Sequence, residues 1–530
     1  EVTKLSLLLK VLEGENEETI SKQLTLFQER ALPDLSNNIK CGNSLIGWDI
    51  LKDNPGLTQD EIDRINPFDW DKEFPEIFER GGFNIVIGNP PYVRHGLLSD
   101  MRVYFQQHYQ TYRGVADLYV CFIEKGISLL KDDGVFSYIV ANKWMRAKYG
   151  EPLRRWLKTQ HIDEIIDFGD LPVFQGATTY PCIIRIYKKA PNTNFRVTQV
   201  ESLDFTNLYD YVKEHGYYIN QTSLDDSCWT LADEHTQALL NKLHSKGIPL
   251  GEFVNGKIYL GVLTGLDKAF IIDKPTRDRL IAEDPRSMEV IKPFLMGRYI
   301  KRYQLPVSDK YLIFMPKGWT HKKIDSSSDA LSWLKNNYPA IANHLLPFAN
   351  AAAKRDSSNR GEYWWELRSC EYYDEFEISK ILWPEISGSA RFAFDESGAY
   401  TNHKVYLIPG ATYYLLGLLN SSLLRLYIHS VCTDLQGDSF NFSVAFVRRT
   451  PIRAINFSDS ADAARHDRMV SLVEQMLTLH KQLQEARTPH EQTALQRQIE
   501  AKDLQIDALV YELYGLTEEE IKIVEGEMKP

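Results

Sequence analysis

The chain has 530 residues, 43% of them hydrophobic and 25% charged, which is enough apolar surface for two or three domains. Its six cysteines lie far apart and show no paired spacing, which argues against a disulfide framework or a metal site and favours a cytoplasmic protein. No apolar stretch is long enough to span a bilayer, and nothing resembles a signal peptide. Because Glu1 already lies in a helical pattern, we expect further segments of the same polypeptide upstream.

The formal net charge of −11 is unevenly distributed along the chain. Residues 251–455 carry 26 Lys and Arg against 22 Asp and Glu, so the negative excess lies entirely in the other parts. Cations that displace counterions from phosphates supply much of a protein's affinity for DNA. The middle of the chain is therefore the candidate DNA-binding region.

Residues 1–190 alternate helical and strand patterns, which predicts a doubly wound α/β sheet. Helices are expected at residues 3–12 and 117–130, and strands at 38–40, 83–87, 134–140, 162–168 and 180–187. The strand at 83–87 is a continuous apolar run of the kind that is buried on both faces of a sheet. The last two strands could pair as an antiparallel edge.

Two further parts follow this sheet. Residues 191–250 have a weak, polar pattern, which indicates a connecting segment with one helix near residues 234–243. Residues 251–455 mix short aromatic-rich strands with short helices, among them 330–337 and 411–430. This mixture predicts an irregular α+β domain.

Residues 456–530 are predicted to form a helical hairpin. Amphipathic patterns cover residues 461–486 and 490–514. Between them, Thr488 is a suitable helix cap, Pro489 suits a first helical turn, and Glu491 completes a capping box. These signals set the start of the second helix.

The tetrapeptide Asn89-Pro90-Pro91-Tyr92 is the strongest chemical signal, because it follows the apolar strand, where doubly wound sheets bind ligands. The two prolines fix the backbone and remove two donors, so the turn presents carbonyl groups and the Asn89 side chain. This is an acceptor surface for an amino group on an aromatic base. Asn89 and Pro90 would accept its two protons, and Tyr92 would stack on the ring. The alternative is an ordinary turn, since Asn-Pro and Pro-Pro are common in loops.

With this motif and its context, the chain resembles the gamma-class DNA amino-methyltransferases, and more closely the fused type IIG restriction-modification enzymes. The resemblance implies an incomplete methyltransferase sheet of Rossmann-like fold with S-adenosylmethionine as cofactor. In residues 39–45 it implies a cofactor contact by Asn43, where many relatives have aspartate. By the same resemblance, Pro91 and Asp117 belong to the cofactor side and Phe174 stacks on the flipped target base. A helix start is the alternative role for Asp117.

The middle domain resembles the target-recognition domain of type IIG enzymes in residues 261–270, 291–300, 364–368 and 414–424, and residues 505–525 resemble their C-terminal end. Basic residues near these segments are the expected contacts to phosphates and base edges of double-stranded DNA. They are Arg298, Lys301, Arg302, Lys354, Arg355, Arg360, Arg448 and Arg449. For any single one, a solvated surface charge is the alternative.

Two features of the family are missing from this sequence. We find no glycine-rich turn after a strand in residues 1–80, where the family holds the cofactor, and no nuclease motif. We therefore expect sequence-specific adenine-N6 methylation in the full-length protein, within a restriction-modification system, while this chain is expected to bind cofactor poorly alone. The alternatives are a DNA-specificity module serving a separate catalytic part, and methylation of RNA or of a protein glutamine.

Overall fold

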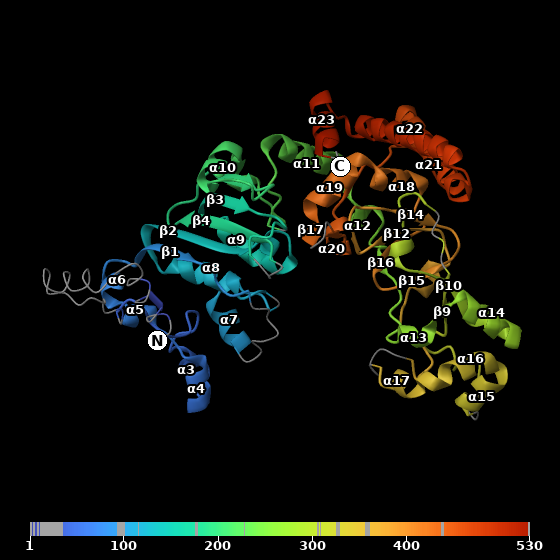
Figure 1. The fold of residues 1–530 in the computed structure, drawn as a ribbon, viewed down its shortest axis with the longest axis horizontal. Coiled ribbons are helices and arrows are strands. Elements are labelled where there is room, and N and C mark those ends of the chain that lie inside the picture. Colours follow the sequence, from blue (N-terminus) through green and yellow to red (C-terminus); the bar gives the residue numbers. More distant parts are fainter. Residues whose placement is uncertain are drawn as a thin grey trace. The chain divides into compact units, whose positions relative to one another are not determined.

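The computed structural model describes residues 37–92, 101–114, 116–174, 179–226, 228–304, 309–324, 329–355, 361–435 and 439–527, and the single residues 3, 6, 7, 10, 35 and 307. It divides the chain into two compact units, Glu1–Trp229 and Thr230–Pro530 (Figure 1). The predicted helix at 3–12 lies mostly outside the described residues. In the described part, none of the helices has the length and apolar character needed to cross a membrane.

Unit 1 is built on a six-stranded sheet of order β1-β2-β4-β3-β5-β6. Its strands are β1 (Phe83–Gly88), β2 (Leu130–Ala141), β3 (His161–Asp167), β4 (Pro181–Tyr187), β5 (Asn194–Gln199) and β6 (Tyr217–Asn220). β1 is parallel to β2, and β4 lies antiparallel between β2 and β3. β1, β2 and β3 therefore end at the same edge of the sheet, and the predicted tetrapeptide follows β1 at that edge.

The sheet corrects three expectations. The antiparallel pairing of the last two predicted strands is confirmed, but they do not form the edge, because β5 and β6 extend the sheet beyond β3. The connecting segment 191–250 is also more than a connection, since it supplies β5, β6 and α10 (Leu208–His215). The predicted strand at 38–40 is wrong: these residues form a turn and irregular backbone.

The burial predicted for β1 is also wrong. Ile85 is 63% exposed and Ile87 is 80% exposed, because among the described residues only β2 pairs with β1. Ile184 and Ile186 of β4, which has strands on both sides, are completely buried. A run of apolar residues predicted burial, but the position of β1 at an edge leaves part of it open.

Unit 1 also contains short helices before and between its strands (Figure 1). They are α3 (Ile50–Asp53), α4 (Gln59–Ile65), α5 (Trp70–Glu73), α6 (Pro75–Glu79), α7 (Arg102–His108), α8 (Tyr119–Ser128) and α9 (Glu151–Leu157). α8 confirms the helix predicted at 117–130. It packs closely against β2 because Gly126 leaves room for the ring of Phe136.

Unit 2 contains two four-stranded sheets, of order β15-β10-β11-β9 and β14-β12-β16-β8. The strands of the first are β9 (Ile271–Asp273), β10 (Ile291–Leu295), β11 (Lys310–Ile313) and β15 (Tyr400–Thr401), and those of the second are β8 (Tyr259–Leu260), β12 (Lys380–Pro384), β14 (Ala393–Asp395) and β16 (Val405–Pro409). Smaller sheets are formed by β7 (Ile248–Pro249) with β19 (Pro451–Ile452), and by β13 (Ile386–Ser387), β17 (Thr433–Leu435) and β18 (Ser439–Asn441). The predicted α+β character of this region is confirmed.

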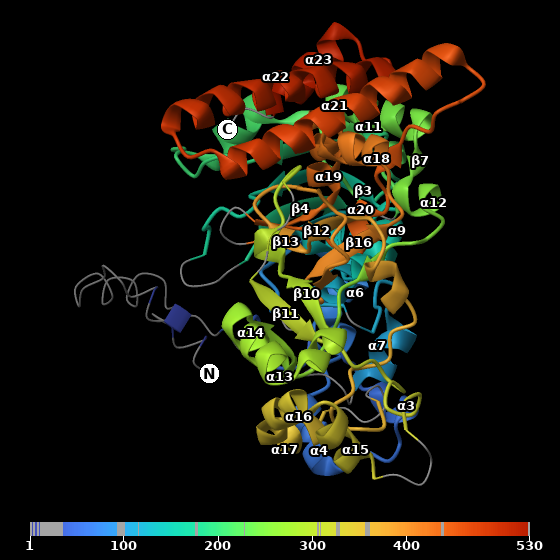
Figure 2. The ribbon, with the colours of Figure 1, turned by 90° about the vertical axis from the view of Figure 1, so that its right-hand side faces the viewer.

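The helices of unit 2 lie before, between and after these strands in the sequence. They are α11 (Glu234–Lys246), α12 (Leu250–Phe253), α13 (Asp267–Phe270), α14 (Lys274–Glu283), α15 (Ala330–Asn337), α16 (Pro339–Leu345), α17 (Ala349–Ala353), α18 (Tyr413–Asn420), α19 (Ser422–Val431), α20 (Val444–Val447), α21 (Ser460–Glu485), α22 (Pro489–Tyr514) and α23 (Glu518–Glu527). The helix predicted at 411–430 is interrupted at Ser421, which caps α19. The predicted hairpin is confirmed as α21 and α22, which run side by side (Figure 2), with the capping box of Thr488 and Glu491 in place.

Candidate active site

The tetrapeptide Asn89-Pro90-Pro91-Tyr92 begins directly where β1 ends. Asn89 is exposed and Pro90 is buried. The register pairs Gly88 with Tyr138 of β2, and the Tyr92 hydroxyl donates to the carbonyl of Ile139, the next residue of β2, at 3.4 Å. Burial raises the pKa of Tyr92 to about 12, so it stays a neutral phenol at physiological pH. The turn thus presents an exposed amide beside an anchored aromatic ring.

A chain of aromatic and polar contacts connects Tyr92 with Asp117. The Tyr92 ring packs edge-to-face on Tyr119, with 6.1 Å between ring centroids. Tyr119 is fully buried, and its hydroxyl lies 2.8 Å from that of Tyr149, which donates to Asp117 at 3.1 Å. Two residues predicted for opposite sides of the site, Tyr92 and Asp117, are therefore linked through Tyr119 and Tyr149.

The position of Asp117 bears on its two predicted roles, a cofactor contact and a helix start. α8 begins at Tyr119, its N-cap is Leu118, and no side chain caps this helix. The Asp117 carboxylate instead accepts the Tyr149 hydroxyl. The structure therefore does not support the helix-start role, and the cofactor role stays a prediction.

A second polar cluster lies at the same edge of the sheet, where β2 and β3 end and β4 begins. The side-chain amide of Asn142 donates to Asp167 at 2.9 Å, and the backbone N–H of Gly169 donates to the same oxygen at 3.1 Å. Asn142 is also tied to the Tyr180 carbonyl by its backbone N–H at 2.7 Å. Sequence reasoning missed these residues, because no local signal distinguishes an asparagine after a strand from one in an ordinary loop.

Asn43 and Phe174, also predicted for the site, lie outside both clusters. The backbone N–H of Asn43 donates to Asn66 at 2.7 Å, and its side-chain oxygen accepts from Leu45 at 3.2 Å. Phe174 is partly buried in the loop after β3. The contacts that the structure gives to these two side chains do not reach Asn89, so their roles stay predictions.

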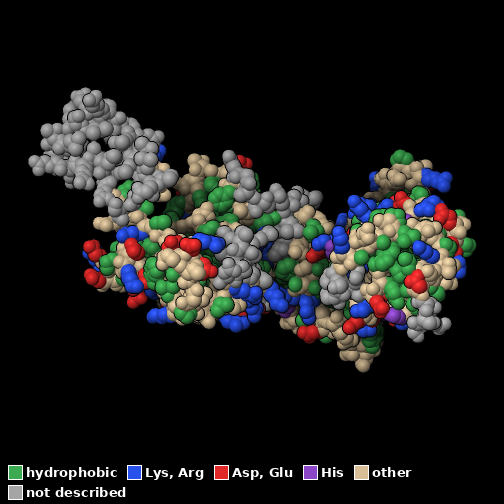
Figure 3. Space-filling model, turned by 90° about the horizontal axis from the view of Figure 1, so that it is seen from below, with side chains coloured by type: hydrophobic (Ala, Val, Ile, Leu, Met, Phe, Trp, Pro, Cys, Tyr) green, Lys and Arg blue, Asp and Glu red, His purple; other side chains and the backbone are tan. Residues whose placement is uncertain are grey.

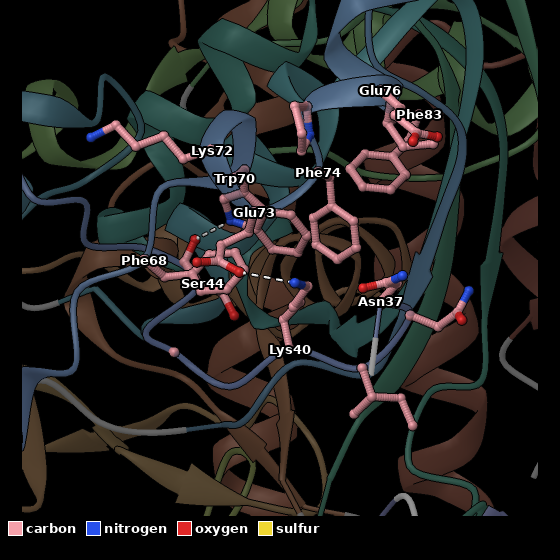
Figure 4. A pocket seen from close by; sticks show the side chains of 15 residues that line it. Asn37, Lys40, Ser44, Phe68, Trp70, Lys72, Glu73, Phe74, Glu76 and Phe83 are labelled. Carbon is pink, nitrogen blue, oxygen red and sulfur yellow. Dashed lines mark hydrogen bonds and ion pairs between the residues drawn. The ribbon is translucent and has the colours of Figure 1, made fainter. Parts of the chain in front are cut away.

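An aromatic pocket of about 960 Å³ lies at the opposite end of β1. Figure 4 shows the rings of Phe68, Trp70, Phe74 and Phe83 around it, with Lys40 paired to Glu73 at 3.2 Å. Phe83 is the first residue of β1, so the strand's length, roughly 17 Å, separates this pocket from Asn89. The pocket therefore lies away from the turn at Asn89, and it is lined by residues of the segment 39–45 that is predicted to contact the cofactor. The described residues contain no cluster of His, Cys, Asp and Glu suited to a metal ion.

The basic residues predicted to contact DNA fall into two groups. Four of them, Arg298, Lys301, Lys354 and Arg448, are exposed, and Arg449 is partly buried. Arg360 lies outside the described residues. Figure 3 shows Lys and Arg side chains interspersed with acidic and apolar ones on one face of each unit. The four exposed residues stay candidates for phosphate contacts.

Arg302 and Arg355 form the second group, and the structure does not support a DNA contact for either. Arg355 is 8% exposed, and its guanidinium donates to the backbone carbonyls of Thr264, Trp364 and Glu366. Arg302 donates to the Asn420 carbonyl and forms an ion pair with Asp503 of α22. Their donors are engaged inside unit 2, where they join separate segments of the chain.

Family models match both units. Residues 1–174 match the Eco57I restriction-modification methylase, and residues 292–452 match the TaqI-like C-terminal specificity domain. The chain is related to type II restriction-modification enzymes. The first match contains the tetrapeptide and strands β1, β2 and β3, and the second covers most of the region predicted to recognise DNA.

Individual relatives agree with these matches. The chain is 25% identical over 549 residues to the type II restriction enzyme and methyltransferase RM.Eco57I of Escherichia coli, covering 96% of this chain and 52% of that protein. It is 26% identical over 467 residues to the type II methyltransferase M.PaeR7I of Pseudomonas aeruginosa, covering 84% of this chain and 73% of that protein. The chain thus spans about half the length of the first relative.

Among solved structures, the type IIL restriction-modification enzyme MmeI in complex with DNA matches with a TM-score of 0.58 and 13% identity. The match covers 91% of this chain and 62% of that protein. At this identity the likeness shows a shared fold. This likeness supports the mixed α/β architecture of the present chain.

Proposed function

We propose that the full-length protein transfers a methyl group from S-adenosylmethionine to N6 of adenine at specific sites in double-stranded DNA, within a restriction-modification system. The observation that carries this proposal is the Asn89-Pro90-Pro91-Tyr92 turn at the end of β1, with an exposed amide beside an anchored tyrosine ring. The matches to a restriction-modification methylase and to a specificity domain support DNA as the substrate.

The turn is suited to activate an aromatic amine. The lone pair of an exocyclic amino group is delocalised into the base, so the nitrogen is a poor nucleophile. The Asn89 side-chain oxygen and the Pro90 carbonyl would accept its two protons and favour a nucleophilic geometry. S-adenosylmethionine would supply the methyl group, with its sulfur keeping the electrons of the carbon–sulfur bond. Asn89 and Pro90 would hold N6 until it releases one proton to water. A base is not required before the attack.

Aromatic rings would hold the target base in the site. Adenine N6 cannot be reached inside the duplex, so the base must leave the stack at a cost of a few kcal/mol. Tyr92 offers a neutral ring whose hydroxyl is already tied to Ile139. Phe174 would cover the other face of the base. Stacking between two rings would offset part of the unstacking cost.

The residues present fit one side of the cofactor site. When bound, S-adenosylmethionine would supply an electrophilic methyl group. Asn43 keeps its side-chain amide and one lone pair for an adenine edge, while Pro91 and the Asp117 carboxylate offer further contacts near the turn. Because β1 pairs only with β2 among the described residues, this chain alone should bind the cofactor weakly.

Replacing Asn89 with alanine in the full-length protein tests the assignment. Loss of a preorganised group aimed at the reacting centre typically costs about 10²–10³ in rate. Methyl transfer from radiolabelled S-adenosylmethionine to DNA should fall by at least this factor. Specific DNA binding and thermal stability should be unchanged, because Asn89 is exposed.

Undiminished methylation by this variant would contradict the role of Asn89. The substrate class is tested in parallel by offering DNA, RNA and protein to the wild-type enzyme and identifying the modified residue by mass spectrometry. N6-methyladenine in DNA supports the proposal. A methylated RNA base or protein glutamine as the sole product would replace it.

A further inference from the structure

The hydroxyl of Tyr149 forms hydrogen bonds with both the Tyr119 hydroxyl and the Asp117 carboxylate. The Tyr149 hydroxyl has a single proton to donate, and it donates this proton to the Asp117 carboxylate, with 3.1 Å between the two oxygens. Its oxygen is then free to accept the proton of Tyr119 at 2.8 Å. The two bonds therefore have one self-consistent direction, from Tyr119 through Tyr149 to Asp117.

The loop that carries Tyr149 is held firmly in place. The buried guanidinium of Arg154 donates to the carbonyls of Trp144 and Ala147, and also to the carbonyl of Asp226. Gly150 allows this loop to pack tightly, because a Cβ at its position would overlap the Trp144 carbonyl. These contacts give the Tyr149 hydroxyl a fixed position.

We infer that Tyr149 is a positioning residue that couples the target-base side of the site to its cofactor side. On one side it holds Tyr119, whose ring supports the edge of Tyr92, the residue proposed to stack on adenine. On the other side it orients the Asp117 carboxylate, proposed to contact the cofactor. The inference rests on the proposed function and adds a residue that no motif assigns.

The Tyr149→Phe variant of the full-length protein removes the hydroxyl and keeps the ring. A hydrogen bond to a charged group contributes roughly tenfold to an equilibrium. We expect about a tenfold rise in the dissociation constant for S-adenosylmethionine, measured by calorimetry without DNA, with a matching rise in its KM. The kcat should fall too, and the fluorescence of 2-aminopurine at the target position should increase less on binding, because Tyr92 loses its support.

Tyr514→Phe is the matched control. The Tyr514 hydroxyl is also buried between two partners, donating to the Pro451 carbonyl and accepting from the Arg453 N–H, but it lies in unit 2. This control should lose stability without a change in cofactor affinity. Tyr119→Phe provides a second variant, because it cuts the link to the base side and leaves the bond between Tyr149 and Asp117. It should reduce the 2-aminopurine signal and leave cofactor affinity nearly unchanged.

The possible outcomes distinguish a failure of the positioning role of Tyr149 from a failure of the proposed function. If Tyr149→Phe only lowers the melting temperature, as Tyr514→Phe does, the positioning role is wrong. If Tyr149→Phe does not fold, Tyr119→Phe provides the test in its place. An equal loss of cofactor affinity and of the 2-aminopurine signal in Tyr119→Phe would overturn the inference. If the wild-type protein binds S-adenosylmethionine but does not methylate DNA, the proposed function fails, while the tenfold loss of affinity still tests Tyr149. If the wild-type protein does not bind S-adenosylmethionine, both are wrong.

Discussion

In unit 1 the polar groups of the candidate site lie where strands end, and Asn89 is exposed there. In unit 2 several charged groups are buried instead. Lys380 and Asp395 are 0% and 2% exposed and form an ion pair at 2.6 Å, and Arg355 is enclosed by backbone carbonyls. The exposed Asn89 is the group proposed to face a substrate, whereas the buried charges of unit 2 hold segments of the chain together.

This difference separates activity from stability. An exposed group at a strand end can be removed with little effect on folding, because solvent replaces its contacts. A buried charge cannot be removed alone, because its partner is left unsatisfied in a medium of low dielectric constant. Substitution of the exposed Asn89 in unit 1 should therefore change the chemistry, and substitutions of buried charges in unit 2 should change the free energy of unfolding.

The largest expected effect on stability is that of Lys380→Met. Its ammonium donates to Asp395 and to the Phe376 carbonyl, both at 2.6 Å, so the variant leaves a buried carboxylate without its cation. We expect a loss of about 3–5 kcal/mol in the free energy of unfolding, measured by urea denaturation. The exposed Lys404, paired with Glu385 at 3.0 Å, is the control, and Lys404→Met should cost at most about 1 kcal/mol. Equal losses in the two variants would contradict the assigned role of the buried pair.

Two neighbouring residues in the chain give the next contrast. Arg355→Met removes hydrogen bonds to four carbonyl groups and should lower the free energy of unfolding by about 2–4 kcal/mol. Lys354→Met, next to it and exposed, should leave stability unchanged. It should instead weaken DNA binding and reduce the slope of affinity against salt concentration by about one. A loss of DNA affinity in a fully folded Arg355→Met protein would restore the original interpretation of this arginine.

The sequence predicted those elements whose signals are local. The hairpin of α21 and α22 follows from apolar spacing along each helix and from the cap at Thr488, and all of these are read within a few residues. Helix α15 occupies the predicted residues 330–337 for the same reason. The tetrapeptide at 89–92 is likewise local, and its position after a strand is confirmed.

The sequence could not predict what depends on distant partners. Arg302 and Arg355 look like surface cations, but their hydrogen-bond acceptors include residues 118 and 91 positions away. Tyr149 binds Tyr119 and Asp117, which lie 30 and 32 positions away, and only the adjacent Gly150 indicates a tight turn. The exposure of β1 depends on which strands pair with it, and strand composition does not encode this order.

The buried network around His480 gives a smaller, pH-dependent effect. Burial lowers the pKa of His480 to about 4, Asp503 opposes this shift and Arg302 adds to it. Because the unfolded chain binds a proton near pH 6.5 and the folded one does not, stability should fall as the pH drops from about 6.5 to 4, by about 2–3 kcal/mol. Burial raises the pKa of Asp507, which acts in the opposite direction. Comparing the wild type with His480→Asn cancels that contribution, and parallel pH profiles would exclude His480 as the source.

The smallest expected effect concerns the open edge of unit 1. Ile87 is 80% exposed, so Ile87→Thr in this chain should change the free energy of unfolding by less than about 0.5 kcal/mol. Ile184→Thr, at a completely buried position of the same sheet, should cost about 2–4 kcal/mol, because it leaves a cavity and buries a hydroxyl. The same two substitutions in the full-length protein would show whether a further segment covers β1. If Ile87→Thr then costs as much as Ile184→Thr, another segment covers β1, and the edge beside Asn89 is as enclosed as the centre of the same sheet.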